Sequence, residues 1–375
     1  MNISIVSYGK FHAFDLAREL KLHNCNISVY SSYPFFIAKK YNISFNEFKS
    51  FFLLQFIDRV TKRVFSRKLK LFFAFIVQFL IKPNQDFIIL WSNTPSFLVK
   101  RIKKKYNSKI IIERGSTHIL FQNKILKDEY KKINKDFSIH QNDINTELIN
   151  YKLADFISIP SIFVKNTFIS QKIDENKLLI NPYGANIKKF YYSKNNSTDK
   201  FIILTVGSGD IRKGLKHIID SHKYLNFNFL HYHIGNIDID LQPLIKKSSN
   251  FINIASVNQD KLRYYYCMAD VFVLASLEEG LSLTILEAMA CKLPIVATRN
   301  TGIESINSKY EFKLLIEPRN PKDIAEKINY LYENTILRNK LSQNALKTIS
   351  KGGFTWSDYG IRYKKLLNEK KSINC

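Results

Sequence analysis

Two glutamates, Glu279 and Glu287, stand eight positions apart in the stretch SLEEGLSLTILEAMACKLPIVATRNTG, which covers residues 276–302. Glu287 is the only charged side chain between Ser282 and Cys291, in a run of Leu, Thr, Ile, Ala and Met that predicts a buried helix. An ionised carboxylate is costly in such surroundings unless hydrogen-bond donors meet it. Two ribose hydroxyls would be suitable donors.

Glu279 lies in the loop LEEGLS, which leaves the carboxyl end of a predicted strand at 271–276. The helix after this loop should begin near Ser282, and its first backbone N–H groups have no partner within the helix. Together with the helix dipole, these groups favour a phosphate or a sugar oxygen. The stretch therefore predicts a site for a ligand that carries both phosphate and sugar.

Short apolar strands alternate with helical patterns along the whole chain, which is typical of parallel sheets covered by helices. The predicted strands lie at 3–7, 26–32, 87–92, 109–115, 156–161 and 177–184 in the first half, and at 200–207, 229–235, 251–256, 271–276, 294–299 and 312–318 in the second. The polar stretch FYYSKNNSTDK at 190–200 predicts a linker. We expect an α/β protein of two doubly wound, Rossmann-like domains facing across a cleft, with ligands beyond the carboxyl ends of the strands.

The order of features around the two glutamates resembles the donor site of family-4 glycosyltransferases, which have the two-domain GT-B fold. These features are a strand, a Glu-Gly loop, a Leu-Glu-Ala-Met-Ala helix, a Pro-led strand and TGIESI. The resemblance implies that Glu279 contacts the donor sugar and that Glu287 binds the ribose of the nucleotide. It also implies that the backbone of Gly280, Leu281 and Ser282 reaches the sugar and the phosphates.

A second segment, ILTVGSGDIRKGLKHIIDS at 203–221, is similar to the first strand and Gly-rich turn of the family's second domain. By this resemblance, the turn at Gly207 and the side chain of Lys213 hold the diphosphate. The family's arginine just after the first glycine is absent, since Ser208 stands there. We expect Arg212 to take its place.

The N-terminal half resembles the same family more diffusely. SYGKFHAFDLAREL places Gly9 in a loop that approaches the donor, and IIIERGSTHI places His118 where a histidine lines the catalytic centre of many relatives. The resemblance thus implies catalytic roles for Glu279, His118 and Lys213, and it adds Val257 to the donor-binding residues. A lone histidine in a loop is otherwise more often incidental.

The resemblance covers nearly the whole chain and implies its domain bounds. We expect an acceptor-binding domain over residues 1–188, completed by a C-terminal helix at 355–375, and a nucleotide-sugar-binding domain over residues 198–354. One departure is Lys292, where the family usually has glycine. We expect the preceding helix to end without the left-handed cap that glycine supplies.

The net charge of +25 points to a polyanionic partner. The densest basic patch, RVTKRVFSRKLKLFFAFIVQFLIKP at 59–83, joins cations to an apolar run, which suits an anionic membrane surface. Compositional drift is the alternative, since Lys, Asn and Ile are all abundant. Nucleic acid is not expected, because no recognisable binding motif accompanies the charge.

Other features bear on compartment and cofactors. The four cysteines show no Cys-x-x-Cys pair or metal-ligand spacing, and the N-terminus MNISIVSYGK lacks the pattern of a secretion signal. The longest apolar run, at 71–81, is shorter than the roughly 20 residues that a membrane helix needs. We expect a cytoplasmic protein, at most peripheral on the inner face of the membrane, with no metal or cofactor.

The resemblance implies a retaining glycosyltransferase that moves a sugar from a nucleotide-diphosphate donor to a glycan or lipid-linked acceptor in bacterial envelope polysaccharide synthesis. UDP is favoured over GDP. A sugar-nucleotide epimerase of the same fold is one alternative. A nicotinamide oxidoreductase fits poorly, since GSGDIR at 207–212 does not complete Gly-x-Gly-x-x-Gly. Outside enzymes, the alternative is a basic protein that binds membrane or nucleic acid.

Overall fold

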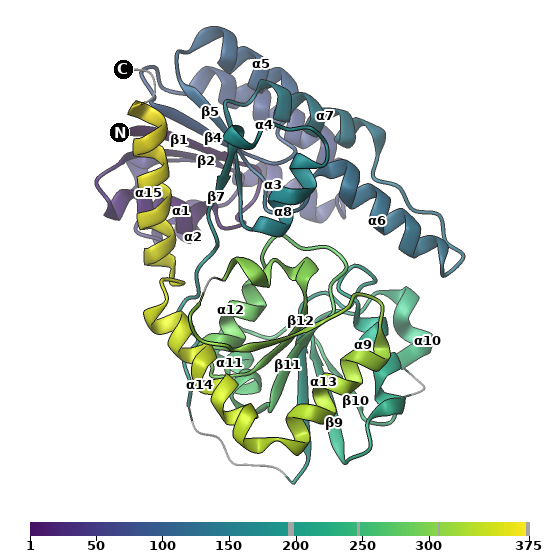
Figure 1. The fold of residues 1–375 in the computed structure, drawn as a ribbon. Coiled ribbons are helices and arrows are strands. Elements are labelled where there is room, and N and C mark those ends of the chain that lie inside the picture. Colours follow the sequence, from purple (N-terminus) through teal and green to yellow (C-terminus); the bar gives the residue numbers. More distant parts are fainter. Residues whose placement is uncertain (194–198, 246–247, 307, 373–375) are drawn as a thin grey trace.

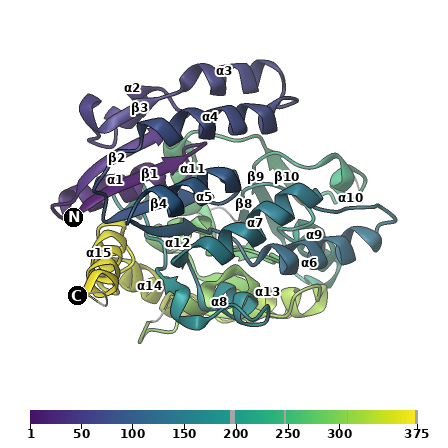
Figure 2. The ribbon, with the colours of Figure 1, turned by 90° about the horizontal axis from the view of Figure 1, so that it is seen from above.

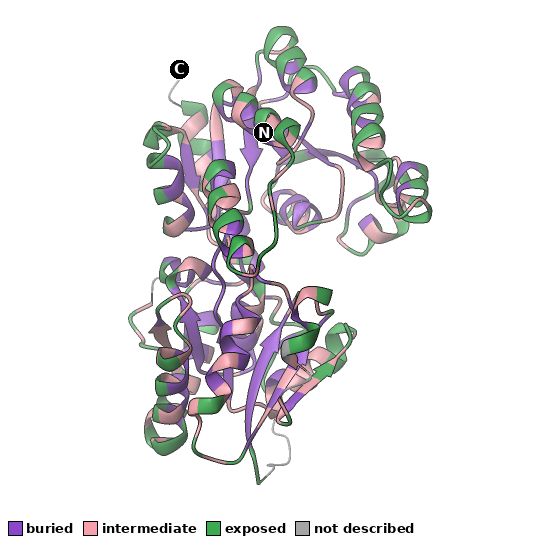
Figure 3. Ribbon diagram, turned by 90° about the vertical axis from the view of Figure 1, so that its right-hand side faces the viewer, coloured by how far each residue is buried: buried purple, intermediate pink, exposed green. Residues whose placement is uncertain are grey.

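The computed structural model describes residues 1–193, 199–245, 248–306 and 308–372. It contains two sheets, each covered by helices, and one lies above the other in Figure 1. Several strands are buried along their whole length, such as FIILW at 87–91 and FIILTV at 201–206, as expected of parallel strands covered on both faces (Figure 3). The predicted α/β architecture of two doubly wound domains is confirmed.

The first sheet has seven parallel strands in the order β3-β2-β1-β4-β5-β6-β7. They are β1 (Asn2–Ser7), β2 (Asn26–Ser31), β3 (Phe48–Ser50), β4 (Phe87–Trp91), β5 (Lys109–Glu113), β6 (Phe156–Ile159) and β7 (Leu178–Ile180). All but β3 were predicted. That edge strand has only three residues, of which Phe48 alone is buried, so it carries almost no pattern.

The helices of the first domain connect these strands. They are α1 (Ala13–Leu22), α2 (Phe35–Lys39), α3 (Phe52–Val60), α4 (Ser66–Leu80), α5 (Ser96–Lys105), α6 (Ile119–Lys131), α7 (Gln141–Leu153) and α8 (Ile162–Ile169). Helix α1 buries Ala13, Leu16, Ala17 and Leu20, whose spacing puts them on one face of the helix.

The second sheet has six parallel strands in the order β10-β9-β8-β11-β12-β13. They are β8 (Phe201–Val206), β9 (Phe229–Ile234), β10 (Phe251–Ile254), β11 (Val271–Leu274), β12 (Ile295–Thr298) and β13 (Lys313–Ile316). Its helices are α9 (Leu215–Ser221), α10 (Gln242–Ile245), α11 (Gln259–Met268), α12 (Leu283–Ala290), α13 (Pro321–Glu333) and α14 (Thr335–Lys351). Of the predicted linker at 190–200, residues 194–198 lie outside the described part.

The last helix, α15 (Trp356–Ser372), crosses back to the first domain and packs on α1 (Figure 1). Gly360 permits this approach, since a Cβ there would lie 2.4 Å from the Cβ of Glu19. The two segments that join the domains run side by side, because the N–H of Ala185 donates to the carbonyl of Phe354 at 2.8 Å. Arg362 adds hydrogen bonds to the side chain of Asn181 at 3.1 Å and to a neighbouring carbonyl.

The end of α12 corrects one expectation. Lys292 itself adopts a left-handed conformation, with φ of 66°. The N–H of Leu293 bonds to the carbonyl of Ala288 at 3.0 Å, and that of Lys292 to the carbonyl of Met289 at 3.0 Å. This is the six-to-one and five-to-two pattern of a glycine-type cap, so the helix has its left-handed end without glycine.

Candidate active site

Two loops leave the carboxyl edge of the second sheet side by side, one after β8 and one after β11. These strands are neighbours, and the strand order reverses between them. The N–H of Leu277 donates to the carbonyl of Arg212 at 2.8 Å, which ties the loops together. Gly214, with φ of 71°, fits closely because a Cβ there would lie 2.0 Å from the carbonyl oxygen of Ala275. Such a reversal point is where open α/β sheets bind ligands.

These loops bring three predicted site residues into contact. The Glu279 carboxylate accepts a hydrogen bond from the Arg212 guanidinium at 2.7 Å and forms an ion pair with the Lys213 ammonium. Burial would raise the pKa of Glu279, but Lys213 and Arg212 hold it below its ordinary value. The carboxylate expected to contact sugar is therefore bound here to the two cations expected to hold the diphosphate.

Glu287 projects from α12 into largely apolar surroundings and, among the residues that the structure describes, meets one protein donor. The hydroxyl of Tyr266, a fully buried residue of α11, donates to its carboxylate at 3.0 Å. Burial nevertheless raises the pKa of Glu287 to about 7. No motif in the sequence marks Tyr266 as a partner of Glu287. The predicted contact between Glu287 and ribose remains a prediction.

The raised pKa of Glu287 predicts pH-dependent nucleoside binding. A carboxylate accepts hydrogen bonds from both ribose hydroxyls, whereas a protonated carboxyl has less accepting capacity. Because the carboxyl is protonated below its pKa, uridine affinity measured by calorimetry should rise as the pH increases through about 7. Uridine is used because it has no phosphate whose own titration would change its affinity. The Glu287→Gln variant should bind uridine with an affinity that does not change with pH. Equal wild-type affinities one unit below and one unit above that pKa would contradict the assignment.

The backbone between these glutamates presses against the first domain. The carbonyl of Gly280 accepts a hydrogen bond from the Ser161 hydroxyl at 2.6 Å, and a Cβ at Gly280 would lie 2.0 Å from the carbonyl oxygen of Gly115. Leu281 is buried, and the Ser282 hydroxyl hydrogen-bonds that of Thr284 at 2.8 Å instead of capping α12. Because the Ser282 hydroxyl does not cap α12, it does not occupy the first backbone N–H groups of the helix.

The remaining predicted donor-binding residues lie in three loops. Gly207 follows β8, and a Cβ there would lie 4.0 Å from the Lys213 side chain, so the turn runs beside this lysine. Gly9 follows β1, where its carbonyl accepts hydrogen bonds from Ser7 and from the next strand. Val257 follows β10 and packs against the hydrophobic core. Their contacts with a donor stay predictions.

His118 lies elsewhere than the resemblance implied. Its ring is 1% exposed and packs against Tyr151 and Phe168, with ring centroids 5.1 and 4.9 Å away. Its Nδ1 accepts from the N–H of Leu120 at the start of α6, and burial followed by the charge of Arg114 lowers its pKa to about 4. The expectation that His118 lines the cleft is corrected: the residue is a neutral, buried helix cap.

This placement predicts a loss of stability for His118→Ala. Removing the ring leaves a cavity between Tyr151 and Phe168 and uncaps α6, so the free energy of unfolding should fall by about 2 kcal/mol. Urea denaturation would measure this loss. A variant with wild-type stability and a selectively reduced kcat would restore the catalytic assignment.

Sequence reasoning missed Glu278, the neighbour of Glu279. Its side chain is fully buried and binds the first domain through Ser116, Thr117 and Gln122. In the sequence, Glu278 is visible only as a second carboxylate beside Glu279 in a short loop. It is not part of the eight-residue spacing that singles out Glu279 and Glu287. Within the described ranges, no group of three His, Cys, Asp or Glu residues could hold a metal ion.

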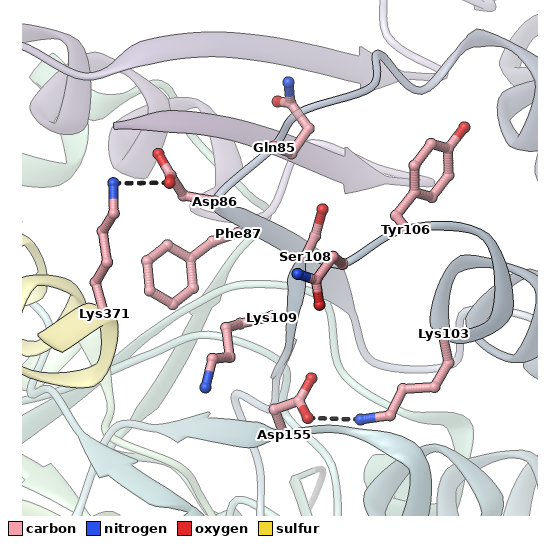
Figure 4. Close-up of a pocket in the computed structure, with 10 residues that line it drawn as sticks. Gln85, Asp86, Phe87, Lys103, Tyr106, Ser108, Lys109, Asp155 and Lys371 are labelled. Carbon is pink, nitrogen blue, oxygen red and sulfur yellow. Dashed lines mark hydrogen bonds and ion pairs between the residues drawn. The ribbon is translucent and has the colours of Figure 1, made fainter. Parts of the chain in front are cut away.

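The first domain has one pocket at the amino ends of its strands and another at their carboxyl ends. A polar groove of about 410 Å³ lies at the amino ends of β4, β5 and β6, where Lys371 pairs with Asp86 and Lys103 with Asp155 (Figure 4). This groove is at the amino ends of the strands, whereas the loops of the candidate site follow the carboxyl ends of strands. A cavity of about 220 Å³ lies at the carboxyl ends of β1 and β4, where the strand order reverses. Its lining includes Tyr8, Phe11, Lys70, Phe73, Trp91 and Asn93.

Residues 187–348 match the family model described as "Glycosyl transferases group 1". An uncharacterized glycosyltransferase of Methanocaldococcus jannaschii is 29% identical over 213 residues, 56% of this chain and 59% of that protein. The N,N'-diacetylbacillosaminyl-diphospho-undecaprenol alpha-1,3-N-acetylgalactosaminyltransferase of Campylobacter jejuni is 30% identical over 217 residues, 52% of this chain and 57% of that protein. The chain thus spans less than two thirds of these relatives.

Solved structures share the whole fold at low sequence identity. Sucrose-phosphate synthase from Thermosynechococcus elongatus superposes with a TM-score of 0.75 at 14% identity, covering 100% of both chains. Anabaena HepE, solved in complex with UDP-glucose, superposes with a TM-score of 0.71 at 13% identity, covering 98% of this chain and 100% of that one. The arrangement of the two domains is the GT-B fold.

Proposed function

We propose that this chain, whose residues 187–348 belong to the glycosyl transferases group 1, is a retaining glycosyltransferase that uses a nucleoside-diphosphate sugar. The observation that carries the proposal is the cluster of Glu279, Arg212 and Lys213 at the reversal point of the second sheet. This cluster lies within the part of the chain that matches the family.

The cluster suits a reaction in which a diphosphate leaves. Lys213 and Arg212 stabilise the charge that develops on the leaving diphosphate, together with the N–H groups at the start of α12, so no metal is required. When the diphosphate takes the two cations, Glu279 is freed to accept hydrogen bonds from the donor sugar. A leaving phosphate oxygen takes the proton of the acceptor hydroxyl as the new glycosidic bond forms on the face from which the nucleotide departs.

A ligand screen tests the donor class. Ligands that bind only the folded chain raise its melting temperature, so UDP- and GDP-sugars should be compared by thermal shift. We expect UDP-sugars to give the larger shift. HepE was solved with UDP-glucose, and this lends support to UDP. The hit should then release nucleoside diphosphate only when an acceptor is added. Release of an isomerised nucleotide sugar would indicate an epimerase instead, and no shift with any nucleotide sugar would overturn the proposal.

The acceptor is proposed to be a glycan or a lipid-linked glycan of a bacterial envelope. The cavity between β1 and β4 supports this class, since its aromatic walls suit a sugar ring or an apolar chain, and the half-buried Lys70 suits a phosphate. The Campylobacter jejuni relative carries an undecaprenol diphosphate in its name, and a Staphylococcus aureus relative is named for capsular polysaccharide biosynthesis. Both names fit an acceptor of this kind.

We further propose that α3 and α4 bind an anionic membrane surface. The two helices lie side by side at one edge of the first domain (Figure 2). Their exposed large apolar residues are Phe52, Leu53, Phe56, Ile57, Val60, Leu71, Phe72, Phe75, Phe79 and Leu80. Exposed cations accompany them, among them Arg63 and Lys68. In the described part of the chain, every helix is too short or too polar to cross a membrane.

Reducing this charge should weaken vesicle binding. Arg63→Ser combined with Lys68→Ser should lower the partition onto vesicles that contain anionic lipid by tenfold or more, since each cation near the surface contributes about 1 kcal/mol. Sedimentation with the vesicles measures this. The matched control is Lys340→Ser with Lys351→Ser, which removes the same charge from exposed positions of α14. If both double variants lost the same amount of vesicle binding, the loss would follow from net charge alone, and the proposed membrane-binding surface would be wrong.

A further inference from the structure

The side chain of Glu278 leaves the second domain and ends among donors of the first. One carboxylate oxygen accepts hydrogen bonds from the N–H of Thr117 at 2.9 Å, from its hydroxyl at 2.7 Å and from the hydroxyl of Ser116 at 2.5 Å. The other oxygen accepts from the side-chain amide of Gln122 at 3.1 Å. The residue is fully buried. Four donors from one short segment after β5 therefore enclose a single carboxylate from the other domain.

This contact is stable only when the domains are together. A buried carboxylate without donors is strongly unfavourable, and here the donors belong to the opposite domain. The Arg212 guanidinium lies 3.7 Å from the second oxygen and adds a favourable charge. If the domains separated, Glu278, Ser116 and Thr117 would each be solvated again. Closure therefore exchanges water for a set of charge-assisted hydrogen bonds.

The same contact determines where the site residues lie. Glu278 is bonded through the main chain to Glu279, and Arg212 donates both to the Glu278 carbonyl at 2.9 Å and to the Glu279 carboxylate at 2.7 Å. The next residue, Gly280, is held by Ser161 of the first domain. Fixing Glu278 against the first domain thus fixes the loop that carries Glu279 relative to the domain that we expect to hold the acceptor.

We propose that Glu278 is a positioning residue, a carboxylate latch that holds the two domains closed and so places Glu279 and Arg212 against the donor. The effect on turnover rests on the proposed function. The latch itself depends only on the contact between the domains and can be tested without turnover.

The test compares Glu278→Ala, Thr117→Val, which removes the hydroxyl donor while keeping the shape, and the double variant. Small-angle scattering should show a larger radius of gyration for Glu278→Ala than for the wild type. Turnover should fall by about tenfold or more, while UDP affinity by calorimetry changes by less than about threefold, because UDP should contact the second domain. Thr117→Val should add little in the Glu278→Ala background, as expected for two residues that share one interaction.

Glu326→Ala, which removes an exposed carboxylate of the same domain, is the inert control. If the radius of gyration of Glu278→Ala equals that of the wild type, Glu278 does not hold the domains together. This result needs no donor substrate, so it stands whether or not the proposed function is correct. An equal loss of UDP affinity and turnover would make Glu278 a ligand-binding residue instead. Fully additive effects of the two substitutions would also contradict the proposal. If Glu278→Ala does not fold, the test depends on Thr117→Val alone. This variant must then have a radius of gyration slightly larger than that of the wild type.

Discussion

Glu279→Gln should lower the rate of sugar transfer by about 10²- to 10³-fold, the usual cost of removing one preorganised polar contact to a transition state. The geometry adds a second expectation for nucleotide affinity. Arg212 and Lys213 both bind this carboxylate, so a neutral amide frees them for the diphosphate. UDP affinity should therefore stay the same or increase. Initial rates and calorimetry on the same preparation measure the two effects.

The matched control is Glu326→Gln, an exposed carboxylate of the same domain that pairs with Lys327. It should leave both quantities unchanged. A Glu279→Gln variant that loses UDP affinity in parallel with its rate would show that Glu279 supports the nucleotide site and not the sugar.

Lys213→Ala should weaken UDP binding by about 100-fold, because truncating one member of a buried charge pair typically costs 2–5 kcal/mol. The ammonium is largely buried beside the Gly207 turn, where little water replaces it. Uridine, which lacks the diphosphate, should bind the variant within about threefold of the wild type. Calorimetry with both ligands separates a phosphate contact from a general disturbance of the site.

Lys216→Ala is the control for charge, since this nearby lysine pairs with Asp220 on α9. It should change UDP affinity by less than about threefold, because its ammonium already has a partner away from the site. Equal losses of UDP and uridine affinity in Lys213→Ala would contradict the assignment of this residue to the diphosphate.

The sheets were predictable because buried parallel strands are continuous apolar runs with polar breaks. Twelve such runs correspond to strands of the structure, and their alternation with helical patterns indicates parallel pairing. The edge strand β3 has no such run. The cap at Lys292 was missed because residue type only biases backbone conformation, and the contacts around the end of α12 outweigh the preference for glycine.

The site was predictable only where its residues lie in motifs that follow neighbouring strands, even though Arg212 and Glu279 are 67 positions apart. Glu279, Arg212 and Lys213 lie on loops from neighbouring strands, so the topology alone brings them together. The partner of Glu278 is separated from it by more than 150 residues, and such pairs leave no local pattern. His118 was misplaced for a related reason, because a histidine after a strand can either enter a cleft or turn back to cap the next helix.

The return of α15 to α1 has a consequence for synthesis on the ribosome. Helix α1 precedes the second domain in the chain, yet it is covered by α15, which follows that domain. The first domain therefore stays incomplete while the whole second domain is translated, unlike the common order in which an N-terminal domain finishes first. The second domain, whose strands all lie between residues 201 and 316, can close before it. A chain truncated before Trp356 should hold a protease-resistant second domain beside a protease-sensitive first one.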